Sequence, residues 1–241
     1  GHDFPARVSP AEREAIDRHM QIIVEATGLR DGPIVAEFIL TQRKADGTES
    51  AVAAPPANPA GREALLVECA PEIGGEYLAD VLVPAMLGET VLKTPGDAFA
   101  IDSTAARHSD EKALEAPGRT DYFEELVRLY TGGVFRTRDF QAAIGSPQRP
   151  ISIRFVPQGD GEVRSIDLPD ELKNQPGLLF ARLLKQSGSK TSLSGGNADR
   201  LAVFAIQAPR ADDQGAGRPE AQLRQIADRL VAAIQDQVQY A

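Results

Sequence analysis

Two apolar segments between residues 26 and 85 constrain the fold of this chain most strongly. The first reads PIVAEFIL and the second ALLVECA, and each has the composition of a buried β-strand apart from one carboxylate, Glu37 or Glu68. A carboxylate in the middle of a buried strand is costly unless a cation meets it. Two such acids on consecutive strands therefore favour a shared divalent metal, which prefers oxygen ligands. The alternative is that both acids lie on a strand face in contact with water.

The residues before the first segment predict a helix. Ser9, Pro10 and Glu12 form a capping-box pattern with a proline at the first helical position. Gly28 lies where a left-handed C-cap is needed. His19 has no local partners for a metal, so we expect it to have a packing role. Apolar or small side chains follow the 3.6-residue period and predict a core-facing stripe at Ile16, Met20, Ile23, Val24 and Thr27.

The two apolar segments predict strands at 34–40 and 64–70, paired around a polar, proline-rich insertion at 43–62. Gly74 and Gly75 then make a tight bend before a helix expected from about residue 76 to 87. A second insertion follows at 88–120, which could hold a short strand at 90–93.

The second half of the chain predicts a further helix and then antiparallel β-structure. Asp121 caps a helix whose apolar side is formed by Phe123, Leu126, Val127 and Tyr130. Short alternating segments from residue 150 onward predict antiparallel strands. Pro219 opens a last helix with an apolar stripe at Leu223, Ile226, Leu230, Ile234 and Val238.

These elements predict an α+β fold with an antiparallel sheet packed with helices. We expect one region at 1–145, which contains the two insertions, and a β-rich segment at 146–241. The second ends in an amphipathic helix and should pack on the same core.

Composition narrows the function. The net charge of −9 over 241 residues argues against non-specific nucleic-acid binding, which depends on Lys and Arg neutralising phosphates. A single cysteine excludes an internal disulfide and a cysteine-based zinc site, and it fits a cytoplasmic setting. No apolar run reaches the roughly 18–20 residues that cross a bilayer, so we expect no membrane partner. The chain does not begin with methionine and could be a fragment of a longer protein.

The order of these segments resembles the C-terminal half of the ATP-grasp enzymes over nearly the whole chain. The resemblance is closest to the carboxylate–amine ligase and carbamoyl-phosphate-synthase-like branch. In that family, an hvEf strand and an iExNpR strand hold the acidic ligands of the magnesium ions on ATP, and a glycine-containing turn follows. The segments that carry the resemblance are GLRDGPIVAEFIL, LLVECAPEIGGEYL, FEELVRLYTGG, DRLAVFAIQ and EAQLRQIADRLVAAI.

The resemblance implies Mg²⁺ and ATP as cofactors, with a carboxylate and an amine as substrates of the full enzyme. It makes Glu37 and Glu68 the metal ligands. Two acids on one side of neighbouring antiparallel strands can bracket such an ion against a polyphosphate. Gly74 and Gly75 could cradle a phosphate with their amides, although a turn without a ligand is the alternative.

Two positions depart from the family pattern. The family has asparagine two residues after the second acid and arginine four residues after it, where this chain has Ala70 and Glu72. Glu72 is a candidate replacement metal ligand, but it cannot stand in for an arginine that meets phosphate oxygens. The chain also lacks a recognisable adenine pocket. We therefore expect the isolated chain to bind ATP weakly or not at all, and to be inactive.

Three functions remain open at this point. The chain is the metal-binding part of an ATP-dependent ligase, a non-catalytic degenerate ATP-grasp module that acts through protein–protein interaction, or an α+β binding protein with no nucleotide connection. Under the first two, the sheet face that carries the acids should support self-association or pairing with a missing N-terminal half.

Overall fold

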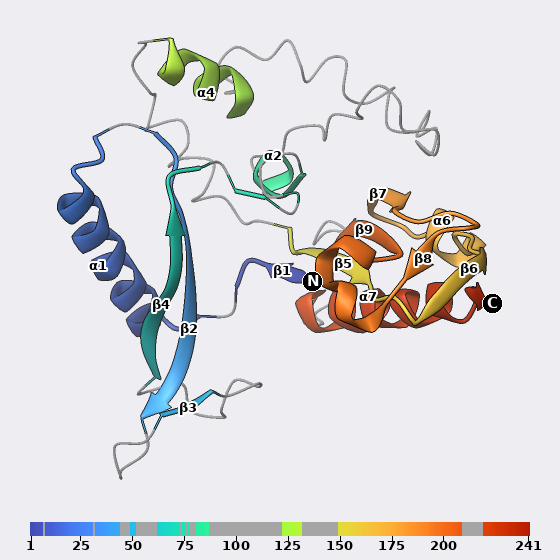
Figure 1. Ribbon diagram of the computed structural model, residues 1–241. Coiled ribbons are helices and arrows are strands. Elements are labelled where there is room, and N and C mark those ends of the chain that lie inside the picture. The colour runs from blue at the N-terminus through green and yellow to red at the C-terminus, as the bar shows by residue number, and fades with distance from the viewer. Residues whose placement is uncertain are drawn as a thin grey trace. The chain divides into compact units, whose positions relative to one another are not determined.

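The computed structural model of the chain is a mixed α+β protein (Figure 1), as predicted. It divides into two compact units: unit 1 contains Gly1–Pro5, Pro84–Arg119 and Asp139–Ala241, and unit 2 contains Ala6–Val83 and Thr120–Arg138. The predicted domain boundary between 145 and 146 lies outside the described residues and stays a prediction. The structure describes residues 1–6, 8–30, 32–43, 49–51, 62–72, 74–75, 77, 81–86, 122–131, 149–208 and 219–241.

Helix α1 (Pro10–Thr27) of unit 2 has the predicted ends. Glu12 accepts a hydrogen bond from the Ser9 amide at 2.7 Å and donates its own amide to the Ser9 hydroxyl, which completes the capping box. Gly28 ends the helix in the left-handed conformation, with φ of 67°. The predicted stripe is wrong at Thr27, which is exposed; its hydroxyl donates to the backbone carbonyl of Ile23, one turn earlier.

Three antiparallel strands form the sheet of unit 2 in the order β3-β2-β4. They are β2 (Val35–Arg43), β3 (Glu49–Ala51) and β4 (Arg62–Ala70). The pairing of β2 with β4 confirms the predicted hairpin around the first insertion. Helix α1 packs against both of these strands (Figure 1). The second predicted insertion, at 88–120, and its short strand lie outside the described residues.

The helix predicted from about 76 to 87 lies only partly within the described residues. Tyr77 has a left-handed backbone with φ of 67°, which interrupts a right-handed helix. Helical backbone continues from Val81 and includes α2 (Val83–Met86).

Helix α4 (Tyr122–Tyr130) confirms the helix predicted after Asp121. Its predicted apolar side is only partly correct. Leu126 is buried, whereas Val127 and Tyr130 are 62% and 68% exposed. Those two positions are wrong as core residues, because no described part of the chain covers that side of α4.

Unit 1 is built on an antiparallel sheet with the strand order β1-β5-β9-β7. The strands are β1 (His2–Phe4), β5 (Ile151–Val156), β7 (Leu178–Leu183) and β9 (Ala202–Gln207). Strand β9 is buried along its whole length, since it lies between β5 and β7. The predicted antiparallel β-structure of the second half is therefore confirmed.

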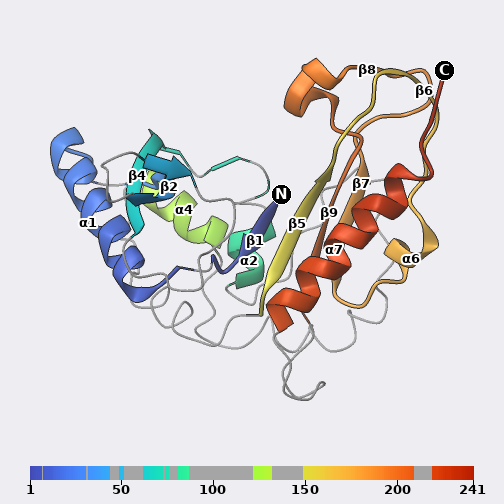
Figure 2. The same cartoon turned by 90° about the horizontal axis from the view of Figure 1, so that it is seen from below.

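Helix α7 (Pro219–Gln235) packs along this sheet (Figure 2) and confirms the predicted last helix. Leu223, Leu230 and Ile234 are buried in the core of unit 1. The prediction that Val238 is helical is wrong, because α7 ends at Gln235. Its side chain nevertheless packs against the same core. Neither α7 nor any other helix in the described part of the chain is long and apolar enough to cross a membrane.

A smaller antiparallel sheet completes unit 1 in the order β10-β6-β8. Its strands are β6 (Gly161–Ser165), β8 (Lys190–Thr191) and β10 (Gln239–Tyr240). Two short helices, α6 (Asp170–Lys173) and the 3₁₀ helix η2 (Leu193–Asp199), belong to the same unit.

Candidate metal-binding site

Glu37 on β2 and Glu68 on β4 are direct partners in the antiparallel ladder. Side chains of directly opposed residues point to the same face, with Cβ atoms about 4.5–5.5 Å apart. The predicted placement of the two acids on one face of adjacent antiparallel strands is therefore confirmed. This arrangement allows one divalent cation to contact both carboxylates, and such ions take oxygen ligands.

The acids lie on the sheet face that points away from α1. Arg62 pairs with Glu12 of α1, and the Phe38 ring lies 5.9 Å from the His19 ring of α1 between centroids. Phe38 therefore faces α1, so its neighbour Glu37 faces the opposite way. His19 has the packing role that the sequence predicted. We call the opposite side the acid face, formed by Val35, Glu37, Ile39 and Thr41 of β2 and by Glu63, Leu65, Glu68 and Ala70 of β4.

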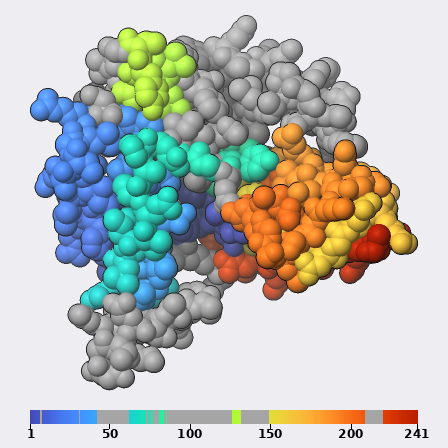
Figure 3. Space-filling view, in the orientation of Figure 1, coloured from blue at the N-terminus to red at the C-terminus, as the bar shows by residue number. Residues whose placement is uncertain are grey.

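Both acids are exposed, so the expectation that they lie in buried strands is wrong. On the same face Ile39 is 47% exposed, and Val67 beside Glu68 is 56% exposed, although Thr41 is buried. Figure 3 shows β4 at the surface. The strands are apolar on both sides, yet among the described elements α1 covers only one. Burial therefore gives no reason to expect a cation here. Repulsion between the two directly opposed carboxylates does give one, because like charges in this position destabilise a strand pair.

Glu72 lies just after β4, in a turn where its amide donates to the carbonyl of Ala70 at 3.0 Å. Within the described ranges, no three His, Cys, Asp or Glu side chains come together as a metal-binding group. Glu37 and Glu68 therefore form a pair, which matches the one or two protein carboxylates that magnesium usually takes. A metal-binding role of Glu72 stays a prediction.

The two glycines after β4 differ in their backbones. Gly74 has φ of 83°, a conformation that favours glycine, whereas φ of Gly75 is not in that region. Among the described residues, a Cβ atom added to Gly75 would meet nothing within 4 Å. Phosphate binding by the two amides stays a prediction.

A buried ion pair that the sequence analysis missed connects α1 with β4. Side chains of Glu12 and Arg62 are 1% and 8% exposed, and Nε of Arg62 donates to the Glu12 carboxylate. Burial alone would raise the pKa of Glu12, but hydrogen bonds from Arg62 and Ser9 and the positive charge of Arg62 hold it below its usual range. In the sequence, the capping-box pattern identifies Glu12 as a residue with a structural role. Arg62 follows a polar insertion and gives no such signal.

A charged network in unit 1 was also missed. Arg154 donates to Asp3 at 2.9 Å and to Asp228 at 2.8 Å, and Ser152 and Arg224 each donate to Asp3 at 2.7 Å. Although burial alone would raise the pKa of Asp3, these donors and the two arginine charges hold it below its usual range. The network joins β1 to β5 and α7. Its members neutralise one another, so it has a structural role.

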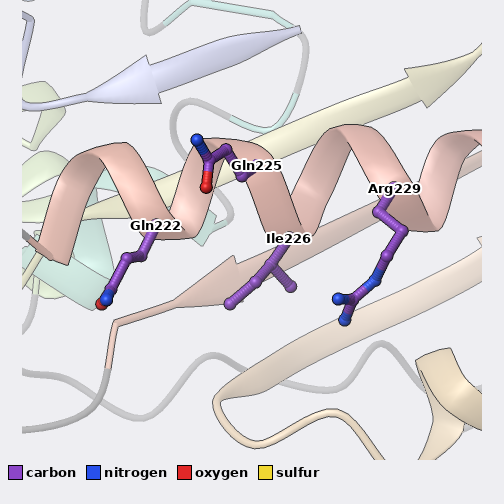
Figure 4. Close-up of a pocket in the computed structure, with 4 residues that line it drawn as sticks. All are labelled: Gln222, Gln225, Ile226 and Arg229. Carbon is purple, nitrogen blue, oxygen red and sulfur yellow. The ribbon is translucent and has the colours of Figure 1, made fainter.

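A shallow pocket lies on the outer side of α7 (Figure 4). Its described lining consists of Gln222, Gln225, Ile226 and Arg229. Arg229 pairs with Glu171 at 2.8 Å, and the lining holds no carboxylate or nucleophile. The described lining of this pocket offers no group for catalysis. We therefore take the Glu37–Glu68 pair as the candidate site within the described residues.

Comparisons with known proteins place the fold. No protein-family model matches the chain, and no curated protein matches it. Its structure is similar to that of an L-amino acid ligase from Bacillus licheniformis, with a TM-score of 0.59 and 16% identity over 99% of this chain and 45% of that one. It is also similar to a phosphoribosylglycinamide synthetase from Anaerococcus prevotii, with a TM-score of 0.57 and 12% identity over 100% of this chain and 44% of that one. This chain thus spans less than half the length of both structures.

Proposed function

We propose that this chain, which shares its fold with the ATP-grasp ligases, is the metal-binding C-terminal part of an ATP-dependent ligase. One observation carries the proposal: in a chain with this fold, Glu37 and Glu68 oppose each other on an exposed sheet face. Opposed carboxylates repel, and a divalent cation between them turns this repulsion into attraction.

The residues of the acid pair fit magnesium. Both ligands are hard carboxylate oxygens, and an exposed face leaves coordination positions for water and phosphate oxygens. When bound, magnesium and ATP would supply the activation of a carboxylate as an acyl phosphate, for attack by an amine. The role of this chain is to hold the cation in place with two carboxylates. The side chains of Ala70 and Glu72 offer no amide or guanidinium group to phosphate, so other parts of the enzyme must supply that contact.

The substrates of the complete enzyme are a small carboxylate and a small amine. Both groups occur in an L-amino acid, the substrate class in the name of one similar protein. We further propose that the enzyme acts in the cytoplasm, where a lone cysteine such as Cys69 stays reduced. Weak or absent ATP binding by the isolated chain stays a prediction.

Replacing Glu37 with glutamine should weaken Mn²⁺ binding at least about tenfold, because a direct ligand matters at least as much as an outer-shell partner. The double variant E37Q/E68Q should show no specific binding. Mn²⁺ is the probe, and loss of its free electron paramagnetic resonance signal during titration measures the affinity.

Glu14→Gln is the matched control, since Glu14 is an exposed acid on α1 and the change in charge is the same. This control should bind as the wild type does. Equal Mn²⁺ affinity for the wild type and E37Q/E68Q, or no binding by the wild type, would rule out a metal site at the acid pair.

A non-catalytic interaction module is the second candidate, and the exposed apolar side chains of the acid face favour it. A partner would remove Ile39 of this face, and Val67 next to Glu68, from water, at about 25 cal/mol per Å² of apolar area buried. The partner would be a second copy of the chain or a missing N-terminal half. The absence of the family's asparagine and arginine at Ala70 and Glu72 also favours this candidate.

Sedimentation velocity at micromolar concentration should then show self-association of the wild-type chain. Ile39→Lys should return it to a monomer, because the substitution places a charge within the apolar contact. Ile22→Lys is the control, since Ile22 is 60% exposed on α1. A wild-type chain that stays monomeric would remove support for self-association through this face.

A further inference from the structure

The ladder between β2 and β4 contains one extra residue. Phe38 pairs with Leu66, but the next residue of β2, Glu37, pairs with Glu68. Val67 therefore has no partner residue of its own in β2. Two residues of one strand opposite one residue of the other define a β-bulge, which bends the strand and increases its local twist.

The bulge is not needed to bring the acids together. Without Val67, Leu66 would be followed directly by Glu68, and a regular ladder would place Glu68 opposite Glu37 on the same face. The strand would keep its register on both sides of this point. The extra residue leaves the partner of Glu68 unchanged. What a bulge can change is the direction of a neighbouring side chain.

The bulge has local costs that the described part of the fold does not offset. It interrupts the ladder at Val67. It also leaves that apolar side chain 56% exposed, so the residue contributes little burial. Features that break a local rule without a gain in packing are expected at functional positions, and bulges next to active sites redirect side chains.

We propose that Val67 is a positioning residue that turns the Glu68 carboxylate toward Glu37 so that both contact one divalent cation. This proposal rests on the metal-binding function proposed above. Side chains in a regular ladder stand roughly parallel, with Cβ atoms about 4.5–5.5 Å apart. A magnesium ion needs oxygens at about 2.0–2.1 Å in near-ideal geometry. The bend at Val67 makes the two carboxylates converge.

Deletion of Val67 tests the proposal, because it removes the bulge and retains both acids. The deletion should lower Mn²⁺ affinity at least about tenfold, as changes to residues that orient metal ligands do. It should also alter the resonance spectrum of bound Mn²⁺. The free energy of unfolding of unit 2, measured by amide exchange in β2 and β4, should be unchanged or higher.

Val67→Ser is the companion variant, since it keeps the extra residue and removes the apolar side chain. Its Mn²⁺ affinity should stay close to that of the wild type. A tenfold loss in Val67→Ser would assign the effect to the side chain and overturn positioning by the backbone.

Three other results would overturn the proposal. A deletion variant with wild-type affinity would show that the bulge does not orient Glu68, while the proposed function would stand. A deletion variant that does not fold would show that the bulge serves the fold. No Mn²⁺ binding by the wild type, or equal binding by E37Q/E68Q, would remove the proposed metal site itself.

Discussion

Replacing Arg62 with methionine should lower the free energy of unfolding of unit 2 by about 3–5 kcal/mol at pH 7, because the change leaves a buried carboxylate without its cation. Glu12 is 1% exposed and depends on Arg62 and on the Ser9 amide for hydrogen bonds. Methionine has a similar length, so loss of the charge and of the donor is the main effect.

Amide exchange in β2, β4 and α1 measures this loss for unit 2 directly. Arg229→Met in α7 is the control, followed by amide exchange in β5, β7 and β9 of unit 1, because Arg229 also pairs with a glutamate, Glu171, but its side chain is 62% exposed. An exposed pair contributes about 0–1 kcal/mol. Similar effects for Arg62→Met and Arg229→Met would contradict a strong role for the buried pair.

The contribution of Glu12 should also depend on pH. The pKa of Glu12 is lower in the folded chain than its usual value. The folded state therefore gains stability from the ionised carboxylate above the unfolded pKa of about 4.3, and this gain is lost as the pH falls through the lower, folded value. In Glu12→Gln this part of the acid dependence should disappear.

Helices whose signals are local could be predicted from the sequence. For α1, the capping box predicts where the helix begins and Gly28 predicts where it ends, and each signal is only a few residues long. For α7, Pro219 and a regular apolar stripe determine the start and the buried side. Each of these signals acts over one or two helical turns, so no knowledge of the tertiary structure is needed.

Features that depend on distant residues could not be predicted. The Arg62–Glu12 pair joins β4 to α1, at positions 50 residues apart in the sequence. The exposure of the acid face depends on which elements cover the sheet. A strand sequence that is apolar on both sides predicts that both sides are buried, whether or not another element covers them.

The position of Glu68 shows a further limit. In β4, Arg62 faces α1, as does Leu66 opposite Phe38, and regular alternation would place Glu68 on that side as well. Val67 is taken up as a bulge, so Glu68 keeps the place opposite Glu37 that it would also have in a regular ladder without Val67. The run Leu65, Leu66, Val67 is apolar at every position, so its pattern contains no sign of an extra residue. The acid pair was predicted correctly from the like positions of the two acids, although the geometry that produces it was missed.

Replacing Phe204 with alanine should lower the free energy of unfolding of unit 1 by about 3–5 kcal/mol. Phe204 is fully buried in β9, where its neighbours come from β5, β7 and α7. Strands β5 and β7 cannot move into the cavity without breaking their pairing with β9. Part of the cost is therefore the cavity itself.

Phe155→Ala in β5 is the matched control, because Phe155 is only half-buried and its ring contacts the guanidinium of Arg200 at 3.8 Å from the centroid. Its loss should be clearly smaller, since the site opens to solvent and leaves no closed cavity. Amide exchange in β5, β7 and β9 reports on unit 1 alone. A loss in Phe204→Ala of less than about 1 kcal/mol would mean that β9 is not the centre of an independent core, because a core residue of this size is expected to cost several times more.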